Sequence, residues 1–286
     1  MPKVGRKRPA SRPRPRTPER DYLHGYSREE QDRLYRQARF LEQEVYEHVD
    51  FSRQRHVLEV GCGVGAQTEI LLRRFPELHV QGVDASPSQL GRARQHLAKA
   101  IRDGRVDLAQ ADAARLPFPG NTFDGAFLCW FLEHVQNPVA ILREIRRVLK
   151  AGSTIYCSEL LNSTYFVDPY SPATLQYLFA LNDHQWALKG DPFVGAKLGN
   201  YLLTAGFRNI HTEVKVQFFD NRVPKRRADY IDEWKTVLLS GAPALLDAGK
   251  VTREIVEGMK QELSKLEDDP DAVFFSCWVQ ARAEVV

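Results

Sequence analysis

Short apolar runs alternate with stretches of helical periodicity along the first half of the chain. Leu34, Ala38 and Val45 recur at helical spacing, and Ser27 followed by Glu30 is typical of a helix start. Strands are predicted at residues 56–60, 79–83, 106–109, 123–130 and 154–157, with helices at residues 67–75, 87–97 and 139–148. Because strands that alternate with helices pair in parallel through right-handed crossovers, the pattern predicts an α/β fold.

The rhythm changes after Glu159. Residues 160–200 are rich in aromatic residues and turn formers, and then come predicted helices at residues 198–205, 228–239 and 251–266 and strands at residues 209–219 and 273–281. We therefore expect four parts. They are a tail at residues 1–20, an N-terminal helical segment at 21–52, a ligand-binding core at 53–160, and a cap with the last strands of the sheet at 161–286.

The net charge of +3 is distributed unevenly. Residues 1–20 carry eight Lys and Arg against one Glu, a net +7, so the rest of the chain has a net charge of −4. This tail also holds five of the sixteen prolines. It cannot bury enough apolar surface to offset its ordering entropy and is predicted to be disordered. A nucleic-acid arm and a nuclear-import signal are the two functional alternatives.

The remaining composition is that of a globular protein with a sizeable core, since 43% of the residues are hydrophobic. No apolar run approaches the roughly 20 residues that a membrane span needs, and no apolar stretch follows the basic N-terminus as in a secretory signal. The four cysteines are far apart and show no metal-binding spacing. We expect no metal, no membrane contact and a cytoplasmic location, or a nuclear one if the tail is an import signal.

The sequence Gly61-Cys62-Gly63-Val64-Gly65 lies between the first predicted strand and the first helix of the core. Glycines permit a tight turn against a ligand, and the helix start offers free N–H groups. Ligands of open parallel sheets bind at this place. Residues 61–66 also satisfy the dinucleotide fingerprint, with Asp84 near the distance expected of a ribose-binding acid. The loop alone therefore leaves a nicotinamide cofactor and other nucleoside ligands open.

Two acidic residues favour a different ligand from a dinucleotide. Glu59 lies two residues before Gly61, where it suits a ligand with an ammonium group and would repel a pyrophosphate. Asp112 ends the third predicted strand, where it can meet an adenine amino group.

In order and spacing, the segments VLEVGCGVG, VDAS, ADAARLPFPGNTFD and CWFLEHV resemble the successive motifs of class I S-adenosylmethionine-dependent methyltransferases. The resemblance covers about residues 57–159. It implies a Rossmann-like, mostly parallel seven-stranded sheet flanked by helices, with a helical cap. It also implies S-adenosylmethionine as cofactor and S-adenosylhomocysteine as product.

The same resemblance implies a set of cofactor contacts. Glu59, Gly61, Cys62 and Gly63 would surround the methionine part. Asp84 would hold the ribose hydroxyls, with Ala85 and Gln89 nearby. Asp112 and Ala113 would contact the adenine. Leu128 would contribute backbone groups, and Glu133 and His134 would lie beside the methyl group. Apart from the resemblance, Tyr22 and Tyr26 in the segment DYLHGY are candidates to close over the cofactor from the N-terminal segment, with simple packing as the alternative.

Methyl transfer needs an aligned nucleophile and exclusion of water, and a base only for some acceptors. The candidate proton acceptors are Glu159, His134 and His184. The cap is expected to choose the acceptor. Its candidate contacts are the aromatic residues Tyr165, Phe166, Tyr177 and Trp186.

The function predicted is methylation of an oxygen, nitrogen or carbon atom of a small molecule in biosynthesis, with nucleic acid not expected as partner. The alternatives are an RNA or protein methyltransferase that uses the tail and Lys225 to Arg227, a non-catalytic fold relative, and a nicotinamide dehydrogenase. Arsenite methylation would need cysteines in the cap, and residues 160–270 contain none. The sequence leaves the oligomeric state open.

Overall fold

The computed structural model describes residues 22–286. The basic tail, with its predicted disorder, lies outside these residues. The helices are α1 (Arg28–Phe40), α2 (Glu42–Tyr46), α3 (Ala66–Arg74), α4 (Pro87–His96), α5 (Ala98–Arg102), α6 (Pro138–Val148), α7 (Pro172–Ala187), α8 (Leu198–Ala205), α9 (Pro224–Ser240), α10 (Ala242–Asp247) and α11 (Arg253–Asp268), with 3₁₀ turns η1 (Leu132–His134), η2 (Asn162–Thr164) and η3 (Val194–Lys197). The strands are β1 (His56–Val60), β2 (His79–Asp84), β3 (Val106–Gln110), β4 (Phe123–Cys129), β5 (Leu149–Leu160), β6 (Phe166–Asp168), β7 (Arg208–Phe219) and β8 (Val273–Glu284).

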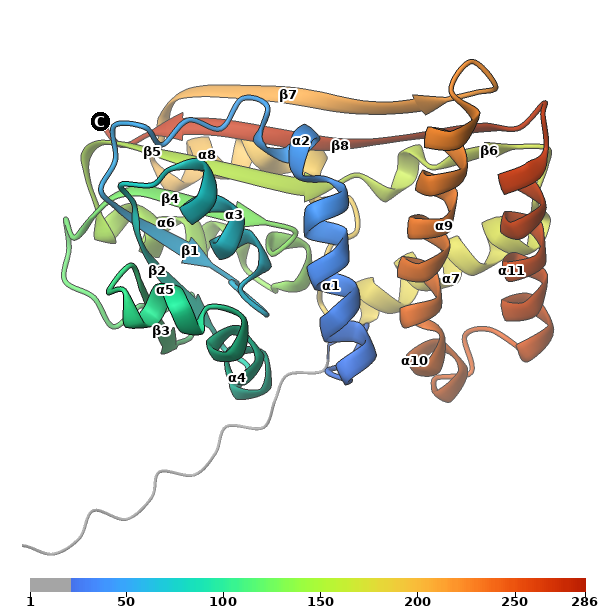
Figure 1. Ribbon diagram of the computed structural model, residues 1–286, viewed down its shortest axis with the longest axis horizontal. Coiled ribbons are helices and arrows are strands. Elements are labelled where there is room, and N and C mark those ends of the chain that lie inside the picture. Colours follow the sequence, from blue (N-terminus) through green and yellow to red (C-terminus); the bar gives the residue numbers. More distant parts are fainter. Residues whose placement is uncertain (1–21) are drawn as a thin grey trace, which may run out of the picture.

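All these strands belong to one sheet of the order β3-β2-β1-β4-β5-β8-β6, with β7 on the other edge of β8 (Figure 1). The first five strands are parallel, and β8 runs antiparallel to β5, β6 and β7. The α/β prediction is confirmed, but the sheet has eight strands where seven were expected. The additional strand, β6, is three residues long, too short to give an alternating pattern.

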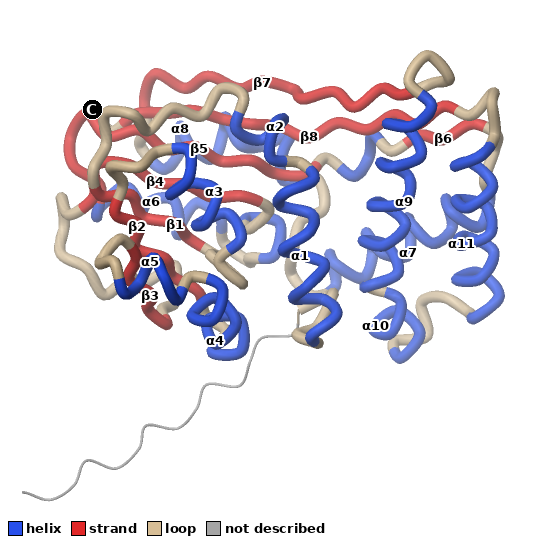
Figure 2. The backbone as a smooth tube through the Cα atoms, in the orientation of Figure 1, coloured by secondary structure: helices blue, strands red, loops and turns tan. Residues whose placement is uncertain are grey.

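Helices cover the two faces of the parallel half of the sheet (Figure 2). Neighbouring residues of β1 show how the faces divide, because Val57 belongs to one hydrophobic cluster and Leu58 to the other. The cluster around Leu58 includes α6 and α8, and the cluster around Val57 includes α1 and α3. The carboxyl ends of β1 to β4 and the starts of the following helices thus lie together at one edge, where ligands of such sheets bind.

The cap helices α7, α9, α10 and α11 extend the hydrophobic cluster that contains Val57 beyond the core. Tyr165 stacks on Trp234 of α9 with ring centroids 4.7 Å apart, and Trp234 meets Phe274 of β8 edge-on at 5.3 Å. Because β7 and β8 are each 12 residues long, they reach from the core into the cap. The cap is therefore built on the same sheet as the core.

Sequence signals at several helix ends act as expected. Ser27 caps α1 by accepting a hydrogen bond from the Glu30 N–H at 3.2 Å. The Glu30 carboxylate does not accept the Ser27 N–H in return but binds Arg33 through two hydrogen bonds of 2.6 and 2.7 Å.

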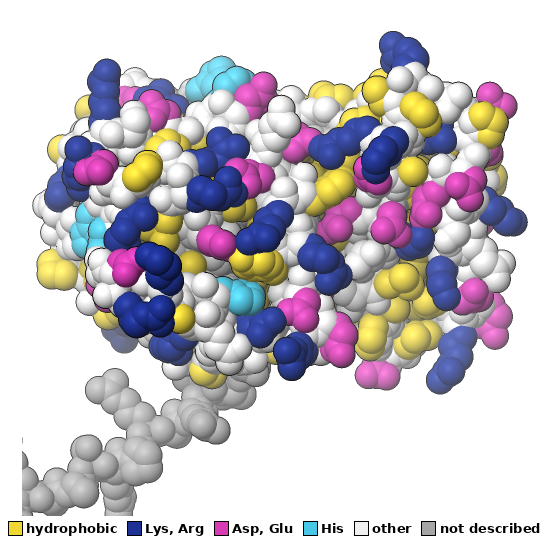
Figure 3. All heavy atoms as spheres, in the orientation of Figure 1, with side chains coloured by type: hydrophobic (Ala, Val, Ile, Leu, Met, Phe, Trp, Pro, Cys, Tyr) yellow, Lys and Arg dark blue, Asp and Glu magenta, His cyan; other side chains and the backbone are white. Residues whose placement is uncertain are grey.

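On the face drawn in Figure 3, Lys and Arg side chains are interspersed with Asp and Glu. No helix within residues 22–286 is long and apolar enough to cross a membrane.

Candidate functional site

The glycine loop joins β1 to α3, and its three glycines all have left-handed backbone conformations. A Cβ on Gly61 would lie 2.3 Å from Cδ2 of Phe131, so no side chain fits there. A Cβ on Gly63 would meet nothing within 4 Å, which leaves that side of the loop open. The N–H groups of Gly61 and Cys62 both donate to the Val83 carbonyl, at 2.9 and 3.0 Å, and so tie the loop to β2.

Asp84 ends β2 directly beside this loop. Its Oδ2 accepts the Gly63 N–H at 2.9 Å, and its Oδ1 accepts the Ser86 N–H at 2.8 Å. Asp112 follows β3, the next strand of the sheet, and accepts the Ala114 N–H at 3.0 Å. Two carboxylates thus stand at the carboxyl ends of adjacent parallel strands, and both are oriented by backbone amides.

A cavity of about 1250 Å³ opens at this edge of the sheet. Its walls come from the glycine loop, from the ends of β2, β3 and β4, from the N-terminal segment and from α9. Of the residues predicted from the sequence, those that line it are Tyr22, Tyr26, Gly61, Cys62, Gly63, Asp84, Ala85, Gln89, Asp112, Glu133 and His134. The predicted residues that do not line it are Glu59, Ala113, Leu128, Glu159, His184, Tyr165, Phe166, Tyr177 and Trp186.

Glu59 is buried in β1 beneath the glycine loop. Its Oε2 accepts the hydroxyl of Thr68 on α3 at 2.5 Å. Burial, with a contribution from the charge of Asp84, raises the pKa of Glu59 to about 8 in spite of that hydrogen bond. Leu128 is buried in the core cluster and does not line the cavity.

Glu159 does not face the cavity, contrary to the expectation that it meets the substrate. Its Oε1 accepts the N–H groups of Phe131 and Leu132 at 3.1 and 2.7 Å, and its Oε2 accepts that of Glu133 at 3.3 Å. Burial and the nearby Glu133 raise its pKa to about 8, although these three donors act in the other direction. Glu159 therefore holds the turn that carries Glu133 and His134.

The predicted aromatic contacts of the cap also lie outside the cavity. Phe166 and Trp186 are more than half exposed, at 53% and 57%. Tyr177 is fully buried and donates its hydroxyl to the Leu238 carbonyl at 2.5 Å, while Tyr165 stacks on Trp234. His184 lies on α7, is partly buried, and does not line the cavity. These side chains build the cap core or cover its outside.

The sequence did not predict several of the residues that line the cavity, among them His24, Arg33, Leu34, Gln37, Ala38, Trp130, Phe131, Leu160 and Val237. Two of them carried a usable signal. His24 stands between Tyr22 and Tyr26, and Trp130 is part of the CWFLEHV segment. Trp130 has a φ of +50°, a rare conformation for a large residue and one that concentrates at functional sites.

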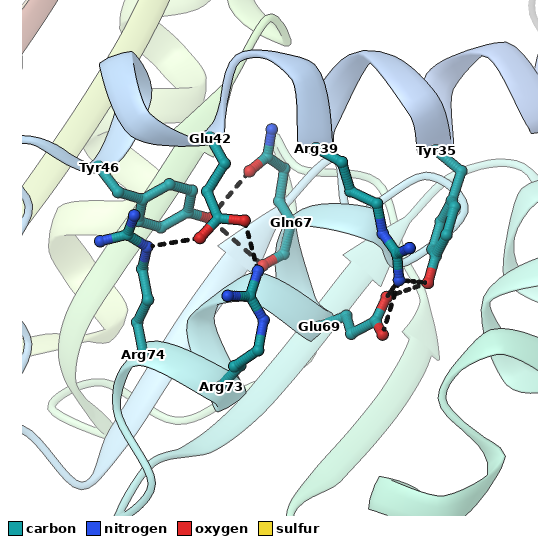
Figure 4. A network of polar contacts seen from close by, with 8 residues as sticks. All are labelled: Tyr35, Arg39, Glu42, Tyr46, Gln67, Glu69, Arg73 and Arg74. Carbon is teal, nitrogen blue, oxygen red and sulfur yellow. Dashed lines mark hydrogen bonds and ion pairs between the residues drawn. The ribbon is translucent and has the colours of Figure 1, made fainter.

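The N-terminal wall of the cavity is fixed onto α3, the helix that begins at the glycine loop (Figure 4). Tyr46 donates its hydroxyl to Gln67 Oε1 at 2.8 Å. Glu42 pairs with Arg73 and with Arg74, and Glu69 pairs with Arg39 and accepts the Tyr35 hydroxyl. Residues 35–46 are thus docked against α3, the helix that begins at the glycine loop.

Residues 58–157 match the family model described as a methyltransferase domain. The chain is 30% identical over 139 residues to the O-methyltransferase resE of Aspergillus sclerotiorum, which covers 49% of this chain and 52% of that protein. It is 37% identical over 105 residues to a demethylmenaquinone methyltransferase of Symbiobacterium thermophilum, covering 36% and 42% of the two chains. The chain thus spans about half the length of the curated relatives it matches.

Solved structures share the fold at low sequence identity. A Haemonchus contortus phosphoethanolamine N-methyltransferase in complex with phosphomonomethylethanolamine and S-adenosylhomocysteine superimposes with a TM-score of 0.54 at 21% identity, over 86% of this chain and 52% of that one. The YcgJ protein of Bacillus subtilis gives 0.54 at 15% identity, over 87% and 99%. Residues 58–157 thus match a methyltransferase domain, and the chain as a whole shares the fold of these solved structures.

Proposed function

We propose that this chain transfers a methyl group from S-adenosylmethionine to a small molecule, with an oxygen atom as the favoured acceptor. The observation that carries the proposal is that two sets of residues line the same cavity. One wall is formed by the glycine loop and the two strand-end carboxylates, and another by His24, Glu133 and His134. A nucleoside site and a set of acid–base groups therefore share one space.

The cavity fits the cofactor by its polar groups as well as by its size. Gln89 Oε1 and Trp130 Nε1 are buried in the wall and have no hydrogen-bond partner within residues 22–286. Such atoms are costly unless a ligand or water pairs with them. Small-molecule pockets occupy roughly 300–1000 Å³, so a cavity of about 1250 Å³ has room for a cofactor and an acceptor together.

Each part of the cofactor has a residue suited to it. Asp84 would accept the ribose hydroxyls, Asp112 would meet the adenine amino group, and the loop from Gly61 to Gly63 would hold the methionine part above Glu59. When bound, the cofactor supplies a methyl group on a positively charged sulfur, already a strong electrophile. The chain's own contribution is to orient the acceptor, to exclude water and to accept a proton where one is released.

The choice of a small acceptor follows from the walls. The N-terminal segment and Val237 of α9 line the cavity together with the strand ends, so an acceptor would lie between the core and these elements. Matched relatives from Aspergillus sclerotiorum and Penicillium expansum are named O-methyltransferases, which favours oxygen as the acceptor atom. The four cysteines are free thiols, and we expect the reaction to take place in the reducing cytoplasm.

Calorimetry with S-adenosylhomocysteine tests the cofactor site. Asp84→Asn should weaken binding by about 10- to 100-fold, since it removes a charged acceptor worth roughly 1.5–3 kcal/mol. The matched control is Asp107→Asn on β3, an exposed aspartate outside the cavity, which should bind within about 2-fold of the wild type. A folded wild-type protein that binds neither S-adenosylmethionine nor S-adenosylhomocysteine would overturn the proposal.

The acceptor class is tested by incubating the full chain with S-adenosylmethionine and a panel of phenols, carboxylic acids and amines. Formation of S-adenosylhomocysteine above the background without acceptor identifies the class. Turnover of phenols or carboxylic acids supports oxygen methylation, and turnover of amines alone would move the acceptor atom to nitrogen.

A further inference from the structure

We propose that His24 is the base that removes the proton from a hydroxyl-bearing acceptor, and that Ser240 fixes the ring of His24 for this task. The inference rests on the proposed methyl transfer and names a catalytic residue and an acceptor chemistry for it. It was not anticipated from the sequence, where the candidate bases were Glu159, His134 and His184.

The hydrogen bonds around Ser240 fix which nitrogen of His24 carries the proton. Nδ1 of His24 lies 2.7 Å from Oγ of Ser240. The Ser240 hydroxyl itself donates to the Val237 carbonyl at 2.7 Å. A hydroxyl has a single proton, and with that proton on the Val237 carbonyl we assign Oγ as the acceptor of the ring and the hydrogen to Nδ1. Neutral His24 therefore keeps its lone pair on Nε2.

That lone pair is available. Nε2 of His24 has no hydrogen-bond partner within residues 22–286, and His24 lines the cavity. A tight turn holds the residue in place, since the Gly25 N–H donates to the Tyr22 carbonyl at 2.9 Å. The rings of Tyr22 and His134 stand edge-on to the His24 ring, with centroids 5.4 and 6.4 Å away.

Burial and the charges around His24 keep its imidazole ring neutral near pH 7. Burial, the Arg33 guanidinium of α1 and His134 of η1 hold the pKa of His24 well below its usual range. The carboxylates nearby are engaged elsewhere. Glu30 binds Arg33, Glu133 accepts from Gln185 Nε2 at 3.0 Å, and Glu233 of α9 faces Arg33 and Arg36. Tyr22 stays protonated because burial raises its pKa.

His134 is placed differently from His24. Its Nε2 lies 3.5 Å from Oε1 of Glu133, so a carboxyl group already faces that nitrogen. Nε2 of His24 faces no such side chain within residues 22–286, so His24 is the better placed of the two histidines to accept a proton.

The proton balance of the step is simple. A lone pair of the acceptor oxygen forms the new O–CH₃ bond, the electron pair of the broken S–CH₃ bond stays on sulfur, and the hydroxyl proton passes to Nε2 of His24. The resulting imidazolium later releases its proton to water. A weak neutral base of this kind suits an acidic hydroxyl, a phenol or an enol, better than an aliphatic alcohol. Apolar walls from Leu34, Ala38, Leu160 and Val237 suit a phenol's ring.

Nitrogen NMR of the full chain with ¹⁵N-labelled histidine and bound S-adenosylhomocysteine tests the tautomer without any acceptor. The signals that vanish in His24→Gln identify the residue. We expect the Nδ1–H form between pH 6.5 and 8, and a shift toward the Nε2–H form in Ser240→Ala. An Nε2–H tautomer or an imidazolium at pH 7 in the wild type would overturn the proposal.

Kinetics with phenol, catechol and 2-naphthol test the role in turnover. His24→Gln should lower kcat by about 10²- to 10⁴-fold and leave the affinity for S-adenosylhomocysteine unchanged. Ser240→Ala should give a smaller loss and move the acid limb of the pH profile, and Ser240→Thr should restore both. The matched control is His211→Gln, an exposed histidine on β7 outside the cavity.

The outcomes separate this inference from the proposed function. If the wild type does not bind S-adenosylhomocysteine, the proposed function fails. If it binds and methylates a phenol, but His24→Gln keeps kcat within about 3-fold, only the role of His24 is wrong. Methylation of amines without any phenol would likewise refute a hydroxyl group as the acceptor.

Discussion

Glu59 shows how one buried acid can connect ligand binding, folding and pH. Its carboxyl group lies beneath the glycine loop, bonded to Thr68, and its pKa is raised to about 8. The folded protein therefore holds a proton between about pH 4.5 and 8 that the unfolded chain has already lost. The stability that Glu59 contributes is fully present below pH 4.5 and is lost as the pH rises through 8.

Glu59→Gln should flatten this part of the pH dependence. The amide has the shape of the protonated acid and can still accept the Thr68 hydroxyl, so the variant should match the wild type at pH 5 and be more stable at pH 9. Urea denaturation at pH 5, 7 and 9 measures the difference. Two curves that stay parallel over this range would show that Glu59 titrates in the same way in the folded and unfolded chains.

At the scale of elements, the end of β5 organises the turn after β4. Three backbone N–H groups of residues 131–133 converge on the Glu159 carboxylate. The first of these residues, Phe131, also fills the space that a side chain on Gly61 would need. One carboxylate thus supports both the acid–base wall of the cavity and the glycine loop.

Glu159→Gln should therefore act through stability. It places an amide NH₂ among N–H donors and leaves at least one of them unpaired, at a cost of about 1–3 kcal/mol. Chemical denaturation should show this loss together with weaker S-adenosylhomocysteine binding. The matched control is Glu144→Gln, because Glu144 also accepts a backbone N–H, from Leu116 at 2.8 Å, but is partly exposed. Normal stability with lost turnover would instead assign Glu159 to the chemistry.

The sequence predicted the parallel half of the sheet because its signals are local. A strand, a glycine loop and a helix follow one another within about 20 residues, and Asp84 and Asp112 stand at strand ends that the pattern locates. The sequence did not predict that the aromatic residues of the cap lie outside the cavity, because their partners are distant in the sequence. Tyr177 meets Leu238, 61 positions away, and Tyr165 stacks on Trp234, so their burial follows from packing between helices.

His24 is the extreme case of such a distant partner. Ser240, which orients its ring, is 216 positions away in the sequence. No spacing rule connects a histidine in an N-terminal turn with the last residue of α9. The strand β6 was missed for a related reason, since its three residues pair with β8 more than a hundred positions later.

At the scale of the whole molecule, the described residues that line the cavity fall between Tyr22 and Val237. Deletion of residues 1–20 should accordingly leave S-adenosylhomocysteine binding and phenol methylation within about 2-fold of the full chain. The tail's charge of +7 would matter only for a polyanionic acceptor. Methylation assays on the probe phenols and on total RNA, with and without the tail, measure both effects. Loss of the phenol reaction on deletion would give the tail a part in the small-molecule site.

The position of β8 between β5, β6 and β7 has a consequence in time. Thr154 pairs with Glu284, so this ladder closes only after about 130 intervening residues have been arranged. Contacts of such long range slow folding, because chain entropy is lost before they form. Until β8 inserts, β5 is an open edge and the cap helices lack the strand they pack on. We expect refolding from urea to pass through a state with the parallel strands formed and β8 detached, a state whose exposed edge invites association with other chains.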